Sequence, residues 1–240
     1  LVSVTGFKEI SFNKCTVNNI IIDTGKPIIT LHRIHTINIK NSIIADISSD
    51  HTVILITKTI YLSVQELTAQ HISISAVEYN HNFKQTHQLF YIEKITAIII
   101  ERSKFSRLNC SIVLARSTDL FAFLDNKVEN CHGISGSIKV INRNLNIAQL
   151  IKISNCSFTK CSSSDNGAAI SIELLALRYQ SKQRQQHYLH NRNILEKWTD
   201  NLEFKSILLM TNTSFQFCKS QESGGTLYIR ANDRHRQGEQ

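Results

Sequence analysis

Six cysteines have the widest chemical repertoire of the side chains in this sequence, because a thiol can bind a metal ion, attack an electrophile or form a disulfide. No two of them have the CxxC spacing of a zinc ribbon or of a thioredoxin-like site. We therefore expect no metal site and no cofactor. The six are Cys15, Cys110, Cys131, Cys156, Cys161 and Cys218.

Three asparagines, Asn109, Asn155 and Asn212, begin Asn-x-Ser triplets, which are acceptors for N-glycosylation in secreted proteins. The Asn, Ser and Thr content of the chain accounts for about that many triplets by chance. Side chains at these positions that faced inward could not carry a glycan. The triplets alone therefore decide nothing about modification.

The composition predicts a folded chain made of strands. Hydrophobic residues make up 42% and charged residues 19%, and there is one Pro in 240 residues. Ile dominates the apolar share, and β-branched residues favour strands. The net charge of +8 invites a nucleic-acid hypothesis. The charges are scattered and carry no RNA-binding or helix-turn-helix signature, so we do not expect a nucleic-acid partner. No stretch is apolar enough to span a bilayer as a helix.

A frame of three positions recurs along the chain: a polar residue, an apolar residue three positions later, and Cys or a substitute three positions after that. The steps between the third positions are in the low twenties from Thr86 to Leu108 and from Leu108 to Cys131, and longer after that. The copies are Glu9, Phe12 and Cys15; Asn80, Phe83 and Thr86; Arg102, Phe105 and Leu108; Asp125, Val128 and Cys131; Asn155, Phe158 and Cys161; and Asn212, Phe215 and Cys218.

A period in the low twenties predicts a solenoid in which each repeat is one coil stacked on the next. Equivalent residues of adjacent coils would then form columns. We expect Phe158 and Phe215 to stack inside, and Gly167 and Gly224 to permit a tight bend. The polar residues Asn155 and Asn212 would bond the backbone at a corner. Adjacent Cys residues such as Cys131 and Cys161 would be close enough for a disulfide, or would pack as reduced thiols; both alternatives stay open. Cys218 would extend the same column.

The stretches F-x-x-C followed by G-A-A-I (158–170) and F-x-x-C followed by G-G-T-L (215–227) resemble the FxxN and GGAI repeats of the polymorphic outer-membrane-protein family. Here Cys stands where the family has Asn, and neither copy contains a complete GGAI. The resemblance covers residues 125–229. It implies a right-handed parallel β-helix of the pectin-lyase-like class, in an extracellular or surface-exposed protein that serves adhesion or display.

The expected function is accordingly a non-enzymatic extracellular or cell-surface module for adhesion, recognition or display, with glycans or surface proteins as partners. The alternative is a carbohydrate-active β-helix enzyme, either a polysaccharide lyase or a glycoside hydrolase. Such enzymes need clustered carboxylates. The 19 acidic residues are dispersed, although coils could bring distant ones together. Open solenoid ends would also favour self-association.

We expect one domain over residues 1–229, interrupted by a basic excursion loop at 178–205, and a polar tail at 230–240. The loop breaks the strand pattern and contains the only Trp. It is interpreted either as a solvated insertion or as a contact loop that uses Arg184, His187, Arg192 and Trp198. The chain starts at Leu1 without Met or a leader, which suggests a part of a larger surface protein.

Overall fold

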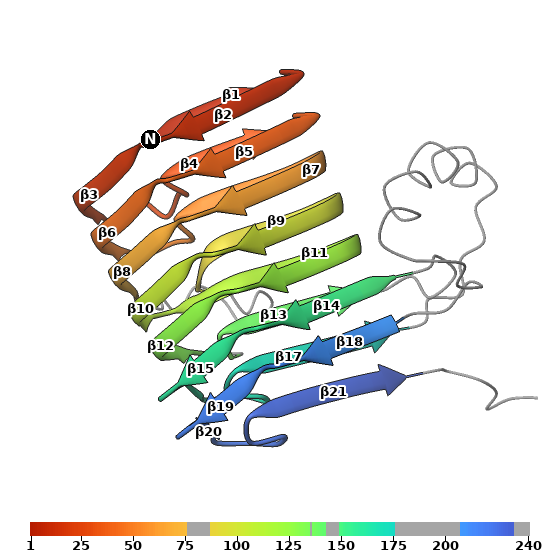
Figure 1. Ribbon diagram of the computed structural model, residues 1–240. Coiled ribbons are helices and arrows are strands. Elements are labelled where there is room, and N and C mark those ends of the chain that lie inside the picture. The colour runs from red at the N-terminus through yellow and green to blue at the C-terminus, as the bar shows by residue number, and fades with distance from the viewer. Residues whose placement is uncertain (76–86, 135, 143–148, 176–206, 233–240) are drawn as a thin grey trace, which may run out of the picture.

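The structure, a computed structural model, describes residues 1–75, 87–134, 136–142, 149–175 and 207–232. Within these ranges every regular element is a strand, and neighbouring strands pair in parallel. The chain coils so that each turn lies on the previous one (Figure 1). The expectation of an all-β chain with long parallel sheets is thereby confirmed. No described helix is long and apolar enough to cross a membrane.

Each coil has three flanks, which are defined by the strands that stack along them. The first flank contains β1 (Val2–Thr5), β4 (Ile29–His32), the first halves of β7 (Ile54–Gln65), β9 (Gln88–Glu101) and β11 (Ser111–Leu124), then β13 (Ile138–Asn142), β17 (Ile170–Leu175) and β21 (Leu227–Asn232). The second flank contains β2 (Glu9–Asn13), β5 (Thr36–Lys40), the second halves of β7, β9 and β11, then β14 (Leu150–Ser154) and β18 (Ile207–Thr211).

The third flank is a separate sheet. It contains β3 (Thr16–Ile22), β6 (Ile43–Ser49), β8 (Thr68–Ile74), β10 (Lys104–Asn109) and β12 (Lys127–Gly133), then β15 (Ser157–Thr159) with β16 (Ser162–Ser163), and β19 (Ser214–Gln216) with β20 (Lys219–Ser220). Inward and outward side chains alternate along these strands, but the alternation shifts by one residue where φ is positive. In β12 this residue is Asn130, so Val128 before it and Cys131 after it are both buried.

The bends of the coil are made by single residues with positive φ. Three such bends occur, at the same spacing, in each of the coils that begin with β1, β4, β7, β9 and β11. Most of them are made by polar or charged residues, although L-residues other than Gly, Asn and Asp enter this region at some cost. The bends of the first series are Gly6, Arg33, Lys58, Lys94 and Ser117; those of the second are Lys14, Asn41, Glu66, Arg102, Asp125, Asn155 and Asn212; those of the third are Asn19, Asp46, His71, Arg107, Asn130, Lys160 and Phe217.

The second series of bends explains the recurring frame. The copies that start at Arg102, Asp125, Asn155 and Asn212 lie in register on adjacent coils, since Phe105 pairs with Val128, Val128 with Phe158, and Phe158 with Phe215. The step from Asn155 to Asn212 is the longest because the chain between β17 and β18 is longer than the corresponding connections of the other coils.

The frame copy at Glu9, Phe12 and Cys15 is wrong. Phe12 pairs with Ile39 on the second flank, whereas Val17 pairs with Ile44 at the start of the column that leads to Phe105. In that part of the chain the true copies start at Lys14, Asn41 and Glu66, and small or aliphatic residues replace Phe and Cys. The copy at Asn80, Phe83 and Thr86 lies outside the described residues.

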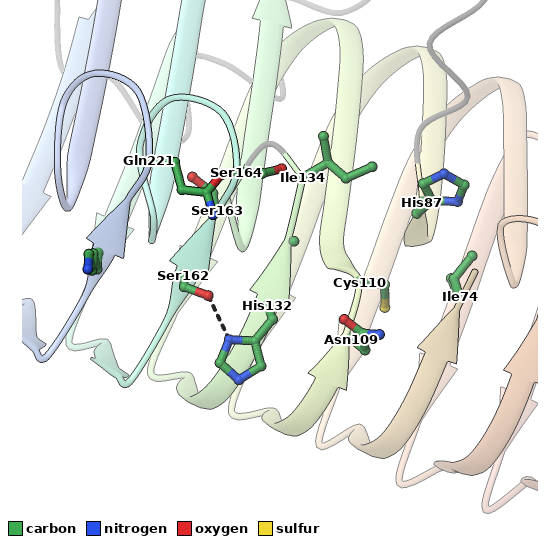
Figure 2. A pocket seen from close by; sticks show the side chains of 12 residues that line it. Ile74, His87, Asn109, Cys110, His132, Ile134, Ser162, Ser163, Ser164 and Gln221 are labelled. Carbon is green, nitrogen blue, oxygen red and sulfur yellow. Dashed lines mark hydrogen bonds between the residues drawn. The ribbon is translucent and has the colours of Figure 1, made fainter. Parts of the chain in front are cut away.

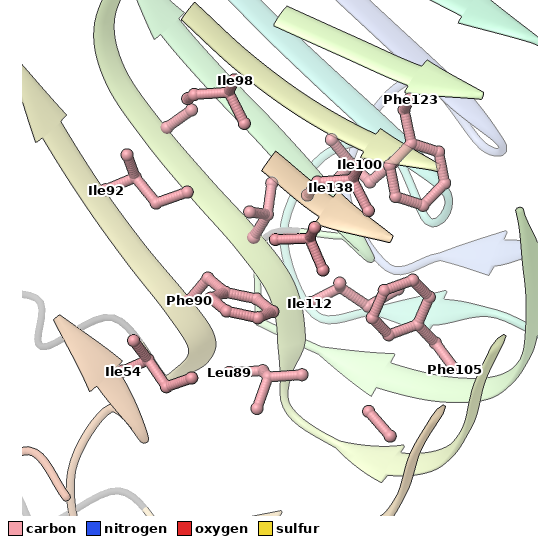
Figure 3. Packing of buried hydrophobic residues seen from close by; sticks show 14 of the residues in the cluster. Ile54, Leu89, Phe90, Ile92, Ile98, Ile100, Phe105, Ile112, Phe123 and Ile138 are labelled. Atoms are coloured by element: carbon pink, nitrogen blue, oxygen red, sulfur yellow. The ribbon is translucent and has the colours of Figure 1, made fainter. Parts of the chain in front are cut away.

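The interior is one continuous apolar core that runs along the described coils. Figure 3 shows a part of it from close by. Within it the rings of Phe105, Phe123, Phe158 and Phe215 stack, with centroid distances of 6.0, 6.1 and 5.3 Å in that order. These distances lie within the range of favourable offset stacking. Aliphatic side chains such as Ile92, Ile100 and Ile138 fill the space between the flanks.

Buried polar side chains replace the backbone hydrogen bonds that are missing between strands beside the second series of bends. Ser103 Oγ accepts a hydrogen bond from the Leu67 backbone N–H at 3.1 Å, and Asn126 Oδ1 accepts one from the Ser103 N–H at 2.8 Å. Asn126 Nδ2 also donates to the Ile100 carbonyl at 2.8 Å. Each side chain therefore satisfies backbone groups of a neighbouring coil where a bend interrupts strand pairing.

The predicted excursion loop at 178–205 and most of the predicted tail at 230–240 lie outside the described residues. The solenoid strands stop at Leu175, at the end of β17, and resume at Ile207, at the start of β18. The predicted domain boundaries stay a prediction.

Candidate functional site

A pocket of about 460 Å³ opens on the third flank, where β10, β12 and β16 end (Figure 2). Its size is within the range of small-ligand sites. Ile74 and Ile134 give it an apolar part, and the polar part comes from adjacent coils. The polar residues that line it are His87, Asn109, His132, Ser162, Ser163, Ser164, Lys219 and Gln221.

Four of these polar residues form an outward column, which we call the polar ladder: Asn109, His132, Ser162 and Lys219. His132 pairs with Ser162 and Ser162 with Lys219, one residue per coil. Asn109 precedes His132 in the same column, because Leu108 pairs with Cys131 directly before it. Parallel strands lie about 4.8 Å apart, so the ladder presents hydrogen-bonding groups at that interval.

One hydrogen bond joins two rungs of the ladder. His132 Nδ1 and Ser162 Oγ lie 2.7 Å apart, and His132 is exposed while Ser162 is half-buried. A hydroxyl beside an imidazole is the first part of a nucleophile and base pair, but that chemistry also needs a carboxylate to orient the imidazole. Among the described residues that line the pocket there is no Asp or Glu. Imidazole and hydroxyl groups both donate and accept hydrogen bonds, so the pair can bond a polar group of a ligand.

Two other ionisable groups of the pocket are neutral at physiological pH. Burial raises the pKa of the Cys110 thiol to about 12, so this thiol does not supply a nucleophilic thiolate. Burial, together with the proximity of His51, lowers the pKa of His87. Lys219, on β20, is the charged residue of the described lining.

The described part of the chain contains no group of three or more His, Cys, Asp or Glu side chains that could hold a metal ion together. Several carboxylates elsewhere on the coils pair with basic residues. Arg102 lies between Glu66, at 3.6 Å, and Glu101, at 3.1 Å. Lys139 pairs with Glu173 at 2.9 Å and with Asp165 at 3.7 Å.

The residues singled out from the repeat lie together in pairs on successive coils. Phe158 stacks on Phe215, Cys161 lies beside Cys218, and Gly167 beside Gly224, as shown by the pairing of Ser162 with Lys219 and the hydrogen bond from Gly167 N–H to the Ser223 carbonyl. Asn155 lies beside Asn212 in the same way.

The expected role of the two asparagines needs correction. Both are exposed, and their side chains bond other side chains: Asn155 Nδ2 donates to Asp125 Oδ1 at 2.9 Å, and Asn212 Nδ2 donates to Asn155 Oδ1 at 3.2 Å. The side chain that bonds the backbone at this bend is Asn126, the residue after Asp125. Burial therefore does not prevent glycan attachment at Asn155 or Asn212.

All six cysteines are free thiols. Cys131, Cys161 and Cys218 form an inward column that continues from Leu108. Burial raises the pKa of Cys161 to about 12 and that of Cys131 well above its ordinary value. Of the two alternatives drawn from the sequence, the structure contains the stack of reduced thiols.

Arg184, His187, Arg192 and Trp198, the residues of the proposed contact loop, lie outside the described residues. The pocket and its ladder were not anticipated from the sequence, because the rungs are unevenly spaced along the chain and differ in type. The sequence feature that identifies the rungs is their position, because His132, Ser162 and Lys219 each directly follow a Cys of the repeat frame.

Comparison of the chain with protein-family models, with curated proteins and with solved structures found no significant match.

Proposed function

We propose that this chain is a non-enzymatic recognition module of an extracellular or cell-surface protein, built as a right-handed parallel β-helix. The observation that carries the proposal is the polar ladder, in which Asn109, His132, Ser162 and Lys219 present one polar group per coil beside a pocket. A rigid surface with polar groups at a constant interval suits an extended ligand with a repeating structure. Glycans and surface proteins of neighbouring cells are the expected ligand classes.

Two arguments support a right-handed β-helix related to the polymorphic outer-membrane proteins. Connections between parallel strands of one sheet are right-handed in nearly all proteins, which favours a right-handed solenoid. The stretches that resemble the polymorphic outer-membrane-protein repeats also occupy equivalent positions of successive coils, as repeats of a β-helix do. This supports a distant relationship to those surface proteins and, through it, a role in adhesion or display.

The proposal is tested by binding and turnover measured on the same ligands. The immobilised chain is screened against a glycan array and against intact cells, and each bound glycan is then assayed for product release with and without calcium. We expect binding without product release. We expect the double variant His132→Ala and Ser162→Ala to weaken binding, because it removes two adjacent rungs.

The control for this experiment removes two exposed polar side chains elsewhere on the third flank, with Asn18→Ala and Ser48→Ala on β3 and β6. Equal binding by both double variants would exclude the ladder as the contact surface. Release of products from a bound polysaccharide would favour the enzymatic alternative, a polysaccharide lyase or a glycoside hydrolase. If a deletion of residues 178–205 leaves binding unchanged, the predicted loop does not contribute to ligand binding.

A further inference from the structure

The third flank changes in charge along the solenoid axis. Its first strands, β3, β6 and β8, contain no Lys or Arg. From β10 onward, five exposed basic residues lie on the same flank or at its bend, and we call them the basic strip. The basic strip consists of Lys104, Arg107, Lys127, Lys160 and Lys219.

The columns of the solenoid set the positions of these charges. Lys104 pairs with Lys127 on the next coil, so two like charges lie side by side. Arg107 and Lys160 are at the third series of bends, and Lys219 is the last rung of the polar ladder. Like charges on adjacent strands repel each other. An anion that lies over both ammonium groups therefore reduces the repulsion between them.

Few carboxylates offset the strip. Glu129 Oε2 lies 3.4 Å from Lys127 Nζ, and Asp125 at the neighbouring bend accepts a hydrogen bond from Asn155. Within the described part of the chain, no salt bridge joins Lys104, Lys160 or Lys219 to a carboxylate. The strip therefore retains a net positive field over several coils and borders a pocket whose described lining has no acidic residue.

One aromatic side chain stands beside the strip. Phe217 is 80% exposed at the bend of the coil that follows Lys160 and lies shortly before Lys219. An exposed ring can pack on the apolar face of a sugar. Single-stranded nucleic acids bind along a row of aromatic side chains on which successive bases stack. The outward positions of the described strands β10, β12, β15 and β16 contain no Phe, Tyr or Trp, and the imidazole of His132 is the one ring among them. They therefore lack a row of stacking rings, and the strip favours a glycan over a nucleic acid.

We propose that the basic strip binds an anionic polysaccharide, which lies along the solenoid axis across β10, β12, β16 and β20 with its acidic groups over the lysines and one end in the pocket. This inference rests on the proposed recognition function and names the ligand class for the same flank. The lysines act as exposed point charges, so binding should weaken as salt is added.

The test uses a heparin oligosaccharide as the anionic probe, dextran as the neutral probe and single-stranded DNA as the competing polyanion. Affinity is measured by calorimetry for the whole chain and for the triple variant Lys104→Gln, Lys127→Gln and Lys160→Gln. The matched control is Lys40→Gln, Lys58→Gln and Lys94→Gln, which removes the same charge from exposed lysines outside the third flank.

We expect the strip variant to bind heparin at least about tenfold more weakly and the control variant to stay within about twofold of the original chain. We expect no binding of dextran, and weaker binding of DNA than of heparin. Equal losses in both variants would mean that only the net charge matters, and would overturn the inference. Tighter binding of DNA, reduced by Phe217→Ala, would overturn it in favour of a nucleic-acid partner.

The anionic-ligand proposal and the recognition proposal can be contradicted separately. If the strip variant still binds cells or a neutral glycan as the original chain does, the recognition function is supported and the anionic polysaccharide is excluded as the ligand. An absence of binding to every probe and every cell would remove both. Circular dichroism of each variant checks that its strands are intact.

Discussion

At the scale of single residues, the polar side chains that matter most to this fold are the buried ones beside the bends. A residue with positive φ turns its peptide groups away from the strand ladder and leaves a backbone N–H or carbonyl without its regular partner. Ser103 and Asn126 supply the missing bonds to adjacent coils. In the coil that follows Asn126, Cys156 occupies the equivalent position. Its sulfur lies 3.3 Å from the Phe123 carbonyl oxygen and 3.1 Å from that of Ser154, and these two acceptors share its single S–H.

Asn126→Ala should lower the free energy of unfolding by about 2–3 kcal/mol, because it leaves the Ser103 N–H and the Ile100 carbonyl buried and unpaired. The control is Asn155→Gly, which removes an exposed amide at a bend where Gly tolerates the positive φ of 53°. It should change stability by less than about 1 kcal/mol. Urea denaturation of the two variants measures the difference. Equal losses would contradict the assigned role of Asn126.

The buried thiols make stability depend on alkaline pH. The pKa of Cys110 is about 12 in the folded chain and 9.0 when unperturbed, so between these values the unfolded chain has lost a proton that the folded chain retains. Raising the pH therefore favours unfolding, and the full contribution of this thiol is present below pH 9.0. Above that value its contribution should fall by a slope that approaches about 1.4 kcal/mol per pH unit.

Cys110→Ala isolates this effect. The cavity that it creates lowers stability by a similar amount at each pH, whereas the loss of the thiol changes the slope. Denaturation measured at several pH values above 9.0 should therefore give a shallower decline for the variant than for the original chain. Parallel declines would mean that the Cys110 thiol is not protected by burial.

At the scale of elements, the coil is defined by its bends more than by its strands. The same spacing of three bends recurs in five coils, although the residues that make them range from Gly and Asn to Arg and Glu. Inward columns vary less, since they stay apolar while the residue type changes, as in the series Ile47, Ile72, Leu108 and Cys131. The geometry of each position in the coil is therefore maintained while the residue type changes.

Some bends tolerate no side chain at all. A Cβ at Gly167 would overlap the Ile170 carbonyl oxygen and lie 2.9 Å from Tyr228 Cβ, while one at Gly25 would meet no atom within 4 Å. Both glycines have positive φ, at 69° and 64°. Gly25→Ala should therefore cost about 1–2 kcal/mol, and Gly167→Ala at least about 3 kcal/mol, because overlap is added to backbone strain. Thermal denaturation of both variants measures the difference; equal shifts would mean that the turn at Gly167 relaxes freely.

At the scale of the whole molecule, the sequence predicts the stacking of coils from Arg102 onward, most clearly where a column repeats the same residue. Phe158 and Phe215 are such a pair, and so are Cys161 and Cys218. Upstream, the same column is occupied by Val17, Ile44 and Ala69, which share no recognisable residue type. The spacing of Phe12 therefore predicts a place in this column that the structure gives to Val17. Unequal coil lengths between bends of the second series further obscure the period. The polar ladder is harder to predict, because its rungs differ in residue type and share only their position, which for His132, Ser162 and Lys219 is directly after a Cys of the frame.

The two ends of the described stack differ from its middle, because their outermost strands have a neighbour on one side only. In the described chain β1, β2 and β3 each pair on one side only, and the same holds for β18 and β21 at the other end. Apolar side chains of the core lie at both ends, among them Val17 and Phe215, which are only partly buried. A free strand edge above an apolar layer is a site for pairing with another chain.

We therefore expect the 240-residue chain to associate end to end as its concentration rises, in a head-to-tail contact that can repeat. Val17→Lys should suppress this association, because it places a charge on the apolar end of the stack. The control is Ile21→Lys on the same strand, whose side chain is 86% exposed and belongs to the outward column that leads to Ser48. Sedimentation velocity over a concentration series distinguishes the three proteins. A chain that stays monomeric throughout, or equal suppression by both lysines, would show that the coil ends are not the contact surface.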